Sequence, residues 1–186
     1  MTFAIHYAIA PCRLGQLLVA ATPRGICQVR FGDDQTSLED ALGREFPWAR
    51  LERDEAALAE RVGILLRAVE GGGIPESLTL DVPGSRFQRR VWEALKAIPQ
   101  GRTRSYGEIA ADVGVAAGAR AVARACAANP VALAIPCHRV VPRDGSVGGY
   151  RWGAWRKRAL LEGEAAAPVS GSGVGLRQSA PAAPAR

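Results

Sequence analysis

The stretch SYGEIAADVGVAAGARAVARACAANP, residues 105–130, decides the fold of the second half of this chain. Ser105 and Glu108 stand three residues apart, just before apolar residues that recur at helical spacing. This is the pattern of a capping box at a helix N-terminus. That period ends at Gly114, because glycine tolerates the left-handed conformation of a helix end. A second helical period covers residues 119–129 and stops at an Asn-Pro pair. Two short helices joined by a turn that contains glycine predict a helix-turn-helix.

The second of these helices has a composition that suits a narrow groove. Alanine fills most of its positions, and Arg120 and Arg124 stand one turn apart on the same face. Helices that bind in the major groove generally carry longer polar side chains. An alanine-coated helix with long cations fits the minor groove, where an arginine can insert among the bases. High helix propensity alone would also explain the alanines, so both explanations remain open.

A cysteine and a histidine stand side by side directly after this region, in the stretch PCHRV at residues 136–140. The preceding apolar run VALAI, residues 131–135, predicts a buried strand that ends at Pro136. A thiol is a nucleophile only as thiolate, and a nearby imidazole is the usual proton acceptor. Because neighbours in an extended chain point to opposite sides, we expect His138 to act on the sulfur of Cys137 through a turn or one water.

Three explanations of this dipeptide remain open at this point. A cysteine–histidine hydrolase would use it as a covalent nucleophile and would turn over without a basic helix pair. A helix-turn-helix regulator would use the basic helices and leave the cysteine idle. A packed, inert thiol is the third explanation, because most buried cysteines are of that kind. A metal site is disfavoured, since the chain has two histidines and no further ligand at a workable spacing.

Charge is segregated along the sequence. Residues 1–85 carry 8 arginines and 12 acidic residues, whereas residues 86–158 carry 14 basic and 4 acidic residues. Lysine is scarce throughout, with 2 lysines against 22 arginines. The base composition of a genome would explain arginine in place of lysine, but it does not explain the segregation by sign. The basic second half therefore predicts a surface that binds a polyanion.

The first half predicts a mixed α/β lobe. The runs at residues 15–21 and 26–31 are strand-like and are joined by the turn TPRG, so they indicate an antiparallel hairpin. Residues 36–46 show apolar positions at fourfold spacing behind Thr36 and Glu39, which suggests a helix with a capping box. The other expected elements in the rest of the chain are helices over residues 55–70, 87–98 and 156–164 and a strand over residues 77–82.

These elements predict an α/β (α+β) chain of three parts. Residues 1–84 form the mixed lobe with its antiparallel sheet, residues 85–164 form a mainly helical lobe, and residues 165–186 are a disordered tail rich in Ala, Gly, Pro and Ser. No apolar run approaches the ~20 residues of a membrane span, and the N-terminus lacks the pattern of a secretory signal. The four cysteines have no framework spacing. We therefore expect a cytoplasmic protein with free thiols.

Several motifs in the right order resemble the O6-alkylguanine-DNA alkyltransferase family. They are SYGEIA, ARAV, an Asn-Pro pair, IPCHRVV, and GYRWG followed by the charged helix RKRALLEGE. The likeness covers residues 4–164, and this ordered set is far more specific than PCHRV alone. The resemblance implies a DNA repair protein with methylated-DNA–protein-cysteine methyltransferase activity. It also assigns DNA binding and alkyl acceptance to the second lobe.

The resemblance implies a catalytic role for five residues. Cys137 accepts the alkyl group from the O6 oxygen of guanine by in-line displacement. His138 deprotonates the thiol through a bound water, and Glu164 orients that histidine. Asn129 braces the turn around the site. Tyr106 helps to rotate the target nucleotide and donates a proton or hydrogen bond toward the guanine ring.

The resemblance also implies how the chain holds its substrate. Arg120 enters the minor groove and fills the space that the flipped nucleotide leaves, and Ser105, Tyr106 and Arg124 also contact the DNA. The pocket for the base is formed by Val140, Tyr150, Arg151 and Trp152. Many members carry small residues where this sequence has Arg151 and Trp152, and an indole at the pocket rim would crowd a large group. We therefore expect good transfer of methyl and poor transfer of benzyl.

The implied partner is double-stranded DNA that contains O6-alkylguanine, with O4-methylthymine as a second expected substrate. A thioether does not hydrolyse, so each molecule would act once. The resemblance implies no cofactor, and we expect a monomer. Some members of the family hold zinc in the first lobe, but His6, Cys12 and Cys27 make no convincing set of ligands here, so we expect no metal.

Overall fold

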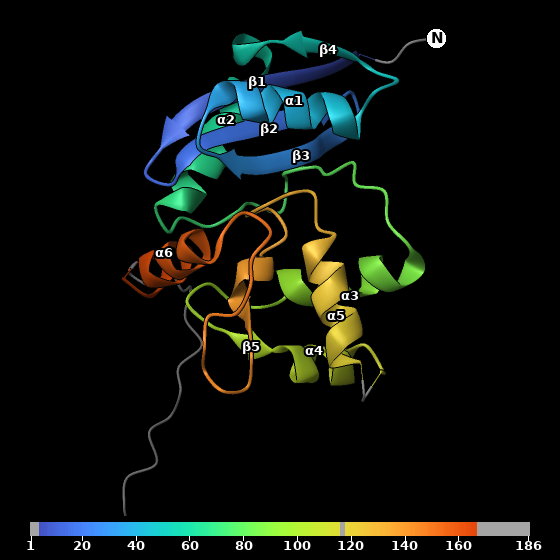
Figure 1. Cartoon of the computed structure of the whole chain (residues 1–186), viewed down its shortest axis with the longest axis vertical. Helices are drawn as coiled ribbons and strands as arrows, with labels where there is room; N and C mark the ends of the chain where they lie inside the picture. Colours follow the sequence, from blue (N-terminus) through green and yellow to red (C-terminus); the bar gives the residue numbers. More distant parts are fainter. Residues whose placement is uncertain (1–3, 116–117, 167–186) are drawn as a thin grey trace, which may run out of the picture.

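The computed structural model of this 186-residue chain describes residues 4–115 and 118–166. Its strands are β1 (Ala4–Cys12), β2 (Gly15–Thr22), β3 (Gly25–Gly32), β4 (Arg50–Arg53), β5 (Arg104–Ser105) and β6 (Val140–Val141). Its helices are α1 (Gln35–Glu45), α2 (Glu55–Val69), α3 (Arg86–Lys96), α4 (Tyr106–Asp112), α5 (Ala119–Ala127) and α6 (Ala154–Ala166), with a 3-10 turn η1 (Cys137–Arg139). We call residues 4–81 the sheet part and residues 86–166 the helical part (Figure 1).

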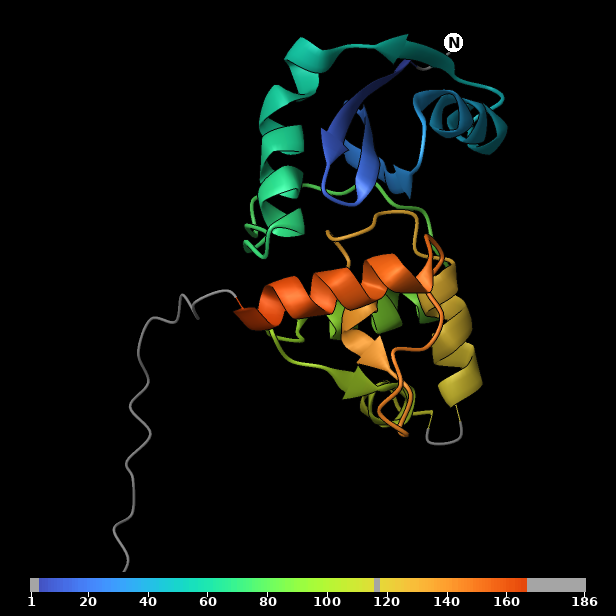
Figure 2. The ribbon, with the colours of Figure 1, turned by 60° about the vertical axis from the view of Figure 1, so that its left-hand side comes forward.

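The predicted hairpin is present and belongs to a four-stranded sheet. The strand order is β3-β2-β1-β4, with β1 antiparallel to β2 and parallel to β4. Successive side chains of a strand point to opposite faces of the sheet. Because β2 and β3 bury nearly all of their residues, both faces of the sheet are apolar and must be covered. Helix α2 covers one face through Leu65 and Val69, and α1 covers the other through Leu38 and Leu42. Figure 2 shows the sheet between these two helices.

The cap of α1 differs from the predicted one. Asp34 is the N-cap, and its carboxylate accepts a hydrogen bond from the Ser37 N–H at 2.8 Å. Thr36 and Glu39 therefore do not form a capping box, and Glu39 instead accepts from the Tyr7 hydroxyl at 3.1 Å. An aspartate one position before the helix competes successfully with a threonine inside it, because its side-chain oxygen reaches the orphan N–H groups.

Two apolar runs that predict strands do not form them. The runs at residues 77–82 and 131–135 each form one isolated bridge to the edge strand β3. In the second run Leu133 has a φ of 68°, which turns the chain back on itself. Asn129 bonds the backbone at both ends of that run and so replaces the partners of a strand. The apolar composition of residues 131–135 signals burial correctly, but it does not separate a strand from a buried turn, and residues 77–82 are only partly buried or exposed.

The helix-turn-helix is confirmed. Ser105 and Glu108 exchange the two hydrogen bonds of a capping box at the start of α4. Gly114 follows the end of this helix with a φ of 70°, as the sequence predicts. Helix α5 packs against both α4 and α3 and buries Val122 and Ala125. The predicted helices over residues 87–98 and 156–164 correspond to α3 and α6, and the predicted tail lies outside the described residues from residue 167 onward.

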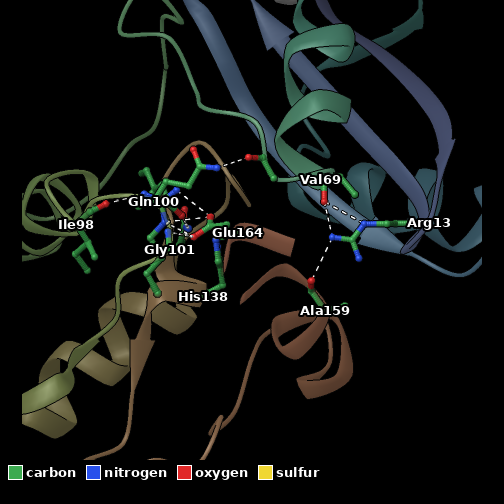
Figure 3. A network of polar contacts seen from close by, with 12 residues as sticks. Arg13, Val69, Ile98, Gln100, Gly101, His138, Ala159 and Glu164 are labelled. Atoms are coloured by element: carbon green, nitrogen blue, oxygen red, sulfur yellow. Dashed lines mark hydrogen bonds and ion pairs between the residues drawn. The ribbon is translucent and has the colours of Figure 1, made fainter. Parts of the chain in front are cut away.

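The two parts share one hydrophobic core. Val29 of β3 exchanges backbone hydrogen bonds of 3.0 Å with Pro130 and Ala132, directly ahead of the cysteine. Arg13 connects the parts a second time, because its guanidinium donates to carbonyl oxygens of both Val69 and Ala159 (Figure 3). The sheet part thus supports the segment that carries the candidate nucleophile. None of the helices within the described residues combines the length and the apolar character that crossing a membrane requires.

Candidate active site around Cys137

The candidate nucleophile lies in a 3-10 turn rather than at the end of a strand. Cys137 begins η1 and is 4% exposed. Asn129, which is fully buried, places its Nδ2 3.3 Å from the Cys137 Sγ and also donates to the Ile135 carbonyl at 2.8 Å. Its own Oδ1 accepts from the Val131 N–H at 3.0 Å. The amide is therefore held in one orientation by hydrogen bonds on both sides of the turn.

The thiol needs help to ionise. Burial raises the pKa of the Cys137 thiol, while the hydrogen bond from Asn129 and the positive charges of Lys157 and Arg151 act in the opposite direction. A buried thiol without these groups would stay protonated and inert. Reactivity at this position therefore depends on a proton acceptor and on nearby positive charge.

His138 is placed to accept a proton. Its Nε2 lies 2.8 Å from the Glu164 Oε1, and both side chains are buried. Burial lowers the pKa of the imidazole, although Glu164 partly opposes that effect, so the neutral form is favoured. With the Nε2 proton donated to the carboxylate, the lone pair lies on Nδ1. This buried Nδ1 has no protein partner within the described residues, which leaves it available as a base.

Glu164 is held as an anion by several donors. It accepts from His138, from the backbone N–H of Gly101 at 3.2 Å, and from Arg139 at 2.9 to 3.1 Å (Figure 3). Burial acts to raise the pKa of this carboxyl group, but the hydrogen bonds from His138 and Arg139 outweigh it and bring the pKa to about 2. Arg139 is itself anchored, because it donates to the Ile98 carbonyl at 2.7 Å. The carboxylate thus keeps His138 in one orientation and one tautomer.

Tyr106 provides a protonated phenol near the thiol. It is the first residue of α4 and is half-buried. Burial raises its pKa to about 12, and the Cys126 and Cys137 thiols act in the same direction. At neutral pH the hydroxyl is therefore a hydrogen-bond donor. Ser105 is buried beside it, and its hydroxyl is used in the cap of α4.

The two arginines of α5 lie outside this cluster. Arg120 and Arg124 are both exposed, whereas the opposite face of the helix packs into the core. Neither forms an ion pair with a carboxylate among the described residues. Their guanidinium groups are therefore presented to solvent, as a DNA-binding role requires, but the structure does not bring them to Cys137.

The GYRWG segment, which we call the GYRWG wall, contacts Asn129 and is tied to the sheet part. Tyr150 and Trp152 contact each other edge to face with ring centroids 5.0 Å apart, and Trp152 is 7% exposed. Arg151 donates to the Asn129 carbonyl at 3.3 Å and lies 3.7 Å from the Glu45 carboxylate. Behind the wall, the buried Arg156 donates to the carbonyl oxygens of Trp152 and Leu14, both at 2.8 Å, and also pairs with Asp33.

Two site residues are missing from the sequence-based set. Arg139 stands inside PCHRV next to the histidine, but its contact with Glu164 cannot be predicted from spacing along the chain. Lys157 is fully buried and donates to the carbonyl oxygens of Val140 at 2.6 Å and Gly149 at 3.3 Å. The scarcity of lysine in an arginine-rich chain is the signal that could have identified it.

No metal centre accompanies this cluster within the part of the chain that the structure describes, since no three His, Cys, Asp or Glu side chains gather there in a suitable way. All four cysteines are free thiols.

Comparison with known proteins places this geometry in a family. Residues 86–166 match the family described as 6-O-methylguanine DNA methyltransferase, DNA binding domain, and residues 5–81 match its ribonuclease-like domain. The chain is 44% identical over 162 residues to the bifunctional transcriptional activator/DNA repair enzyme Ada of Escherichia coli, which covers 87% of this chain and 46% of Ada. The chain thus spans about half the length of that relative.

Other relatives match over nearly their whole length. A methylated-DNA–protein-cysteine methyltransferase of Mycolicibacterium paratuberculosis is 40% identical over 158 residues, which is 84% of this chain and 90% of the relative. The crystal structure of the O6-methylguanine methyltransferase of Mycobacterium tuberculosis is similar with a TM-score of 0.73 and 36% identity, over 89% of this chain and 96% of that one. A structure of the same protein in complex with DNA has a TM-score of 0.73 as well. This chain belongs to the 6-O-methylguanine DNA methyltransferase family.

Proposed function

We propose that this chain repairs DNA by transferring the alkyl group of O6-methylguanine to the sulfur of its own Cys137. One observation carries the proposal: a buried thiol follows the bracing Asn129, and the adjacent His138 pairs with Glu164 while its Nδ1 stays unpartnered by protein. The names of the M. paratuberculosis and E. coli relatives support the same activity.

The proposed reaction is a single in-line displacement. His138 takes the thiol proton through one bridging water, and the resulting thiolate attacks the methyl carbon. A carbon–sulfur bond forms while the bond between the methyl carbon and O6 breaks, and its electron pair passes to the guanine. Tyr106 donates a hydrogen bond or proton toward the ring, so that guanine leaves as a neutral base. The raised pKa of Tyr106 supports this role, because the phenol remains protonated at neutral pH.

DNA engagement is proposed to occur through the minor groove. The slim, alanine-rich α5 presents Arg120 and Arg124 to solvent, and their neighbours within this helix are alanine, valine and cysteine. The buried Cys137 cannot reach the O6-methyl group of a base that is still stacked in the duplex, so the nucleotide must rotate out at a cost of a few kcal/mol. Arg120 would offset part of that cost by filling the space in the duplex, with Ser105 supporting Tyr106 at the start of α4. The DNA complex of the M. tuberculosis relative supports DNA as the partner.

Three finer points belong to the same proposal. The product thioether is stable, so each molecule is expected to react once. O4-methylthymine is expected to be a second substrate, held in the pocket of Val140, Tyr150, Arg151 and Trp152. Residues 85–164 are expected to carry DNA binding and chemistry, with residues 1–84 as their support.

An intact-mass measurement tests the proposal. The protein is mixed with a duplex that contains one O6-methylguanine, and we expect each chain to gain the mass of one methyl group. Cys137→Ser should gain nothing, whereas Cys27→Ser, which removes a buried thiol of the sheet part, should behave as the unchanged protein does. Absence of any adduct on the unchanged protein would overturn the proposal.

A further inference from the structure

The loop after β6 carries an arginine that no other described group of the protein engages. This loop makes a turn in which the Gly145 N–H donates to the Pro142 carbonyl oxygen at 3.3 Å. Within the turn Arg143 is exposed, and among the described residues its guanidinium forms neither a hydrogen bond nor an ion pair. The adjacent carboxylate of Asp144 accepts instead from the Ser146 N–H at 2.9 Å. The charge of this arginine is therefore available to a ligand.

The position of this guanidinium is defined by the two short strands of the helical part. Strands β5 and β6 pair in parallel, with Ser105 opposite Val141, so the segments that follow them lie side by side. Arg143 lies over Gly107, the residue directly after Tyr106. A Cβ atom on Gly107 would lie 2.9 Å from the Arg143 Nη2 and 3.3 Å from its Cζ. Glycine at this position thus leaves the room that the guanidinium occupies at the start of α4.

The nearby carboxylates on α4 are already engaged. The hydrogen bonds from Ser105 lower the pKa of Glu108, and the charges of Arg104 and Arg143 add to this effect. The same carboxylate accepts from the Ser105 N–H at 2.7 Å in the capping box, and Asp112 pairs with Arg104. Arg143 therefore lies among fixed partners without one of its own within the described residues, which favours an anion from outside the chain.

The groups proposed to engage DNA lie at the same end of the molecule. Figures 1 and 2 show the loop after β6, helix α4 and the N-terminus of α5 at the end of the helical part that lies away from the sheet part. Arg120 is exposed in the first turn of α5. This end therefore presents guanidinium groups from two separate segments, Arg120 from the helix-turn-helix and Arg143 from the loop, and Tyr106 belongs to the same end.

We propose that Arg143 binds a backbone phosphate next to the rotated O6-methylguanine nucleotide, so that the loop after β6 forms a second DNA contact besides α5. The inference rests on the proposed function, because it holds the nucleotide whose methyl group passes to Cys137. A guanidinium matches a phosphate through two parallel hydrogen bonds. Phosphate contacts carry no sequence information, but they fix where the duplex lies on the protein. Arg120 would then fill the duplex while Arg143 holds the backbone of the extruded nucleotide beside Tyr106.

The first experiment measures the affinity for a duplex with one O6-methylguanine at several salt concentrations. Every protein carries Cys137→Ser, so no methyl is transferred during the titration. Losing one phosphate contact lowers the slope of log K against log salt by about one. We expect Arg143→Gln to show this change and to bind about tenfold more weakly at low salt. Arg158→Gln, the loss of an exposed charge on α6, should change neither value, and an unchanged slope in Arg143→Gln would overturn the inference.

The second experiment displaces the guanidinium while its charge is retained. Gly107→Ala places a methyl group where the flexible end of Arg143 lies, and that end moves aside more easily than backbone would. We expect Gly107→Ala to weaken binding to the duplex by itself and to have no further effect in the Arg143→Gln protein, because both substitutions remove the same contact. Additive losses would show that Arg143 does not act from its place over Gly107 and would overturn the inference.

The third experiment identifies the phosphate. A methylphosphonate, which is uncharged, replaces one phosphate on the 5′ side or on the 3′ side of the O6-methylguanine nucleotide. We expect one of these two duplexes to bind more weakly to the protein with Arg143 but not to the Arg143→Gln protein. If Arg143→Gln instead weakens binding equally to every duplex, the arginine contributes only to the general positive potential of the surface, and the inference fails.

Failure of this inference is distinct from failure of the proposed function. If the phosphate effect is found as expected but the chain with Cys137 intact takes no methyl from the same duplex, the proposed function fails while the DNA contact of Arg143 stands. If methyl transfer occurs and the phosphate effect is missing, the proposed function stands and the role of Arg143 fails.

Discussion

The sheet part and the helical part treat buried polar groups differently. Among the described residues, the buried polar and charged side chains are Gln28 in the sheet part and Ser105, Asn129, His138, Arg156, Lys157 and Glu164 in the helical part. Gln28 has no hydrogen-bond partner within the described residues, whereas Asn129 uses its amide on three groups. Because a buried polar group costs free energy unless it is bonded, the helical part bears most of that cost, and Asn129, His138 and Glu164 bear it at the turn that carries Cys137. The difference indicates where the chemistry lies.

The largest effect is expected from Glu164→Gln. The substitution leaves the partly buried Arg139 guanidinium without its anion, so the free energy of unfolding should fall by about 3 kcal/mol, the lower end of the cost of breaking a buried ion pair. His138 would also lose the group that fixes its tautomer, and the methyl-transfer rate should fall by more than about 100-fold. Chemical denaturation and single-turnover kinetics measure the two effects. Glu162→Gln, an exposed neighbour on α6, should change neither. Equal effects of the two substitutions would contradict the claim that Glu164 matters because of its buried hydrogen-bond network.

Acid should unfold the protein through the same network. The pKa of Glu164 is about 2 in the folded protein and ~4.3 when unfolded, so its contribution is complete above the unfolded value and is lost as pH falls through the folded one. His138 acts in the same direction from about pH 6.5 downward, because burial depresses its folded pKa and the unfolded chain binds the proton first. Denaturation at stepped pH should show stability falling from pH 6 to pH 2. A Glu164→Gln protein that keeps the full loss below pH 4 would contradict this assignment.

The buried amides of Asn129 and Gln28 allow a direct comparison of the helical part with the sheet part. Asn129→Ala leaves the Val131 N–H without a hydrogen-bond partner among the described residues, which should cost about 1–3 kcal/mol, whereas the Ile135 carbonyl keeps its bond from the Cys137 N–H. Gln28→Leu removes an amide that bonds no protein group within the described residues, so we expect a neutral or slightly stabilising change. Thermal unfolding of both variants provides the measurement. Similar destabilisation by the two substitutions would show that the sheet part uses its buried amide as well.

The smallest effect concerns selectivity in the pocket. Trp152→Gly should raise the ratio of benzyl to methyl transfer by about tenfold, because the proposed pocket for the base includes this indole where many family members carry a small residue. The ratio is measured with O6-benzylguanine and a methylated duplex, so a general loss of activity cancels. Trp155→Gly removes an exposed indole nearby on α6 and should leave the ratio unchanged. Rapid benzyl transfer to the unchanged protein would refute the role of Trp152.

Local patterns predicted much of the fold. The strands of the hairpin, helix α2 and the capping box of α4 follow from periodicity and capping chemistry, which act within a few residues. Strand β1 was not predicted because its alanines give a weak alternation, and β4 was not predicted because it is a short polar edge strand. The strand expected over residues 131–135 is wrong because the side chain of Asn129 supplies the hydrogen bonds that a neighbouring strand would give.

The site was predictable in part, where its residues are adjacent in the sequence. Cys137 and His138 are chemically rare and adjacent, and the family resemblance pointed to Glu164, which the structure brings to 2.8 Å from the histidine. Lys157 and Arg139 could not be predicted from local patterns, because each acquires its role by packing against segments distant in sequence. Burial alone distinguishes Lys157 from an ordinary surface lysine.

The most direct test of the account is a stoichiometric titration of the protein with O6-methylguanine duplex, followed by mass mapping of all four cysteines. We predict that methyl uptake stops at one per chain in the presence of excess substrate, with the whole of it on Cys137. Continued turnover, or methyl found on Cys126, Cys27 or Cys12, would contradict it.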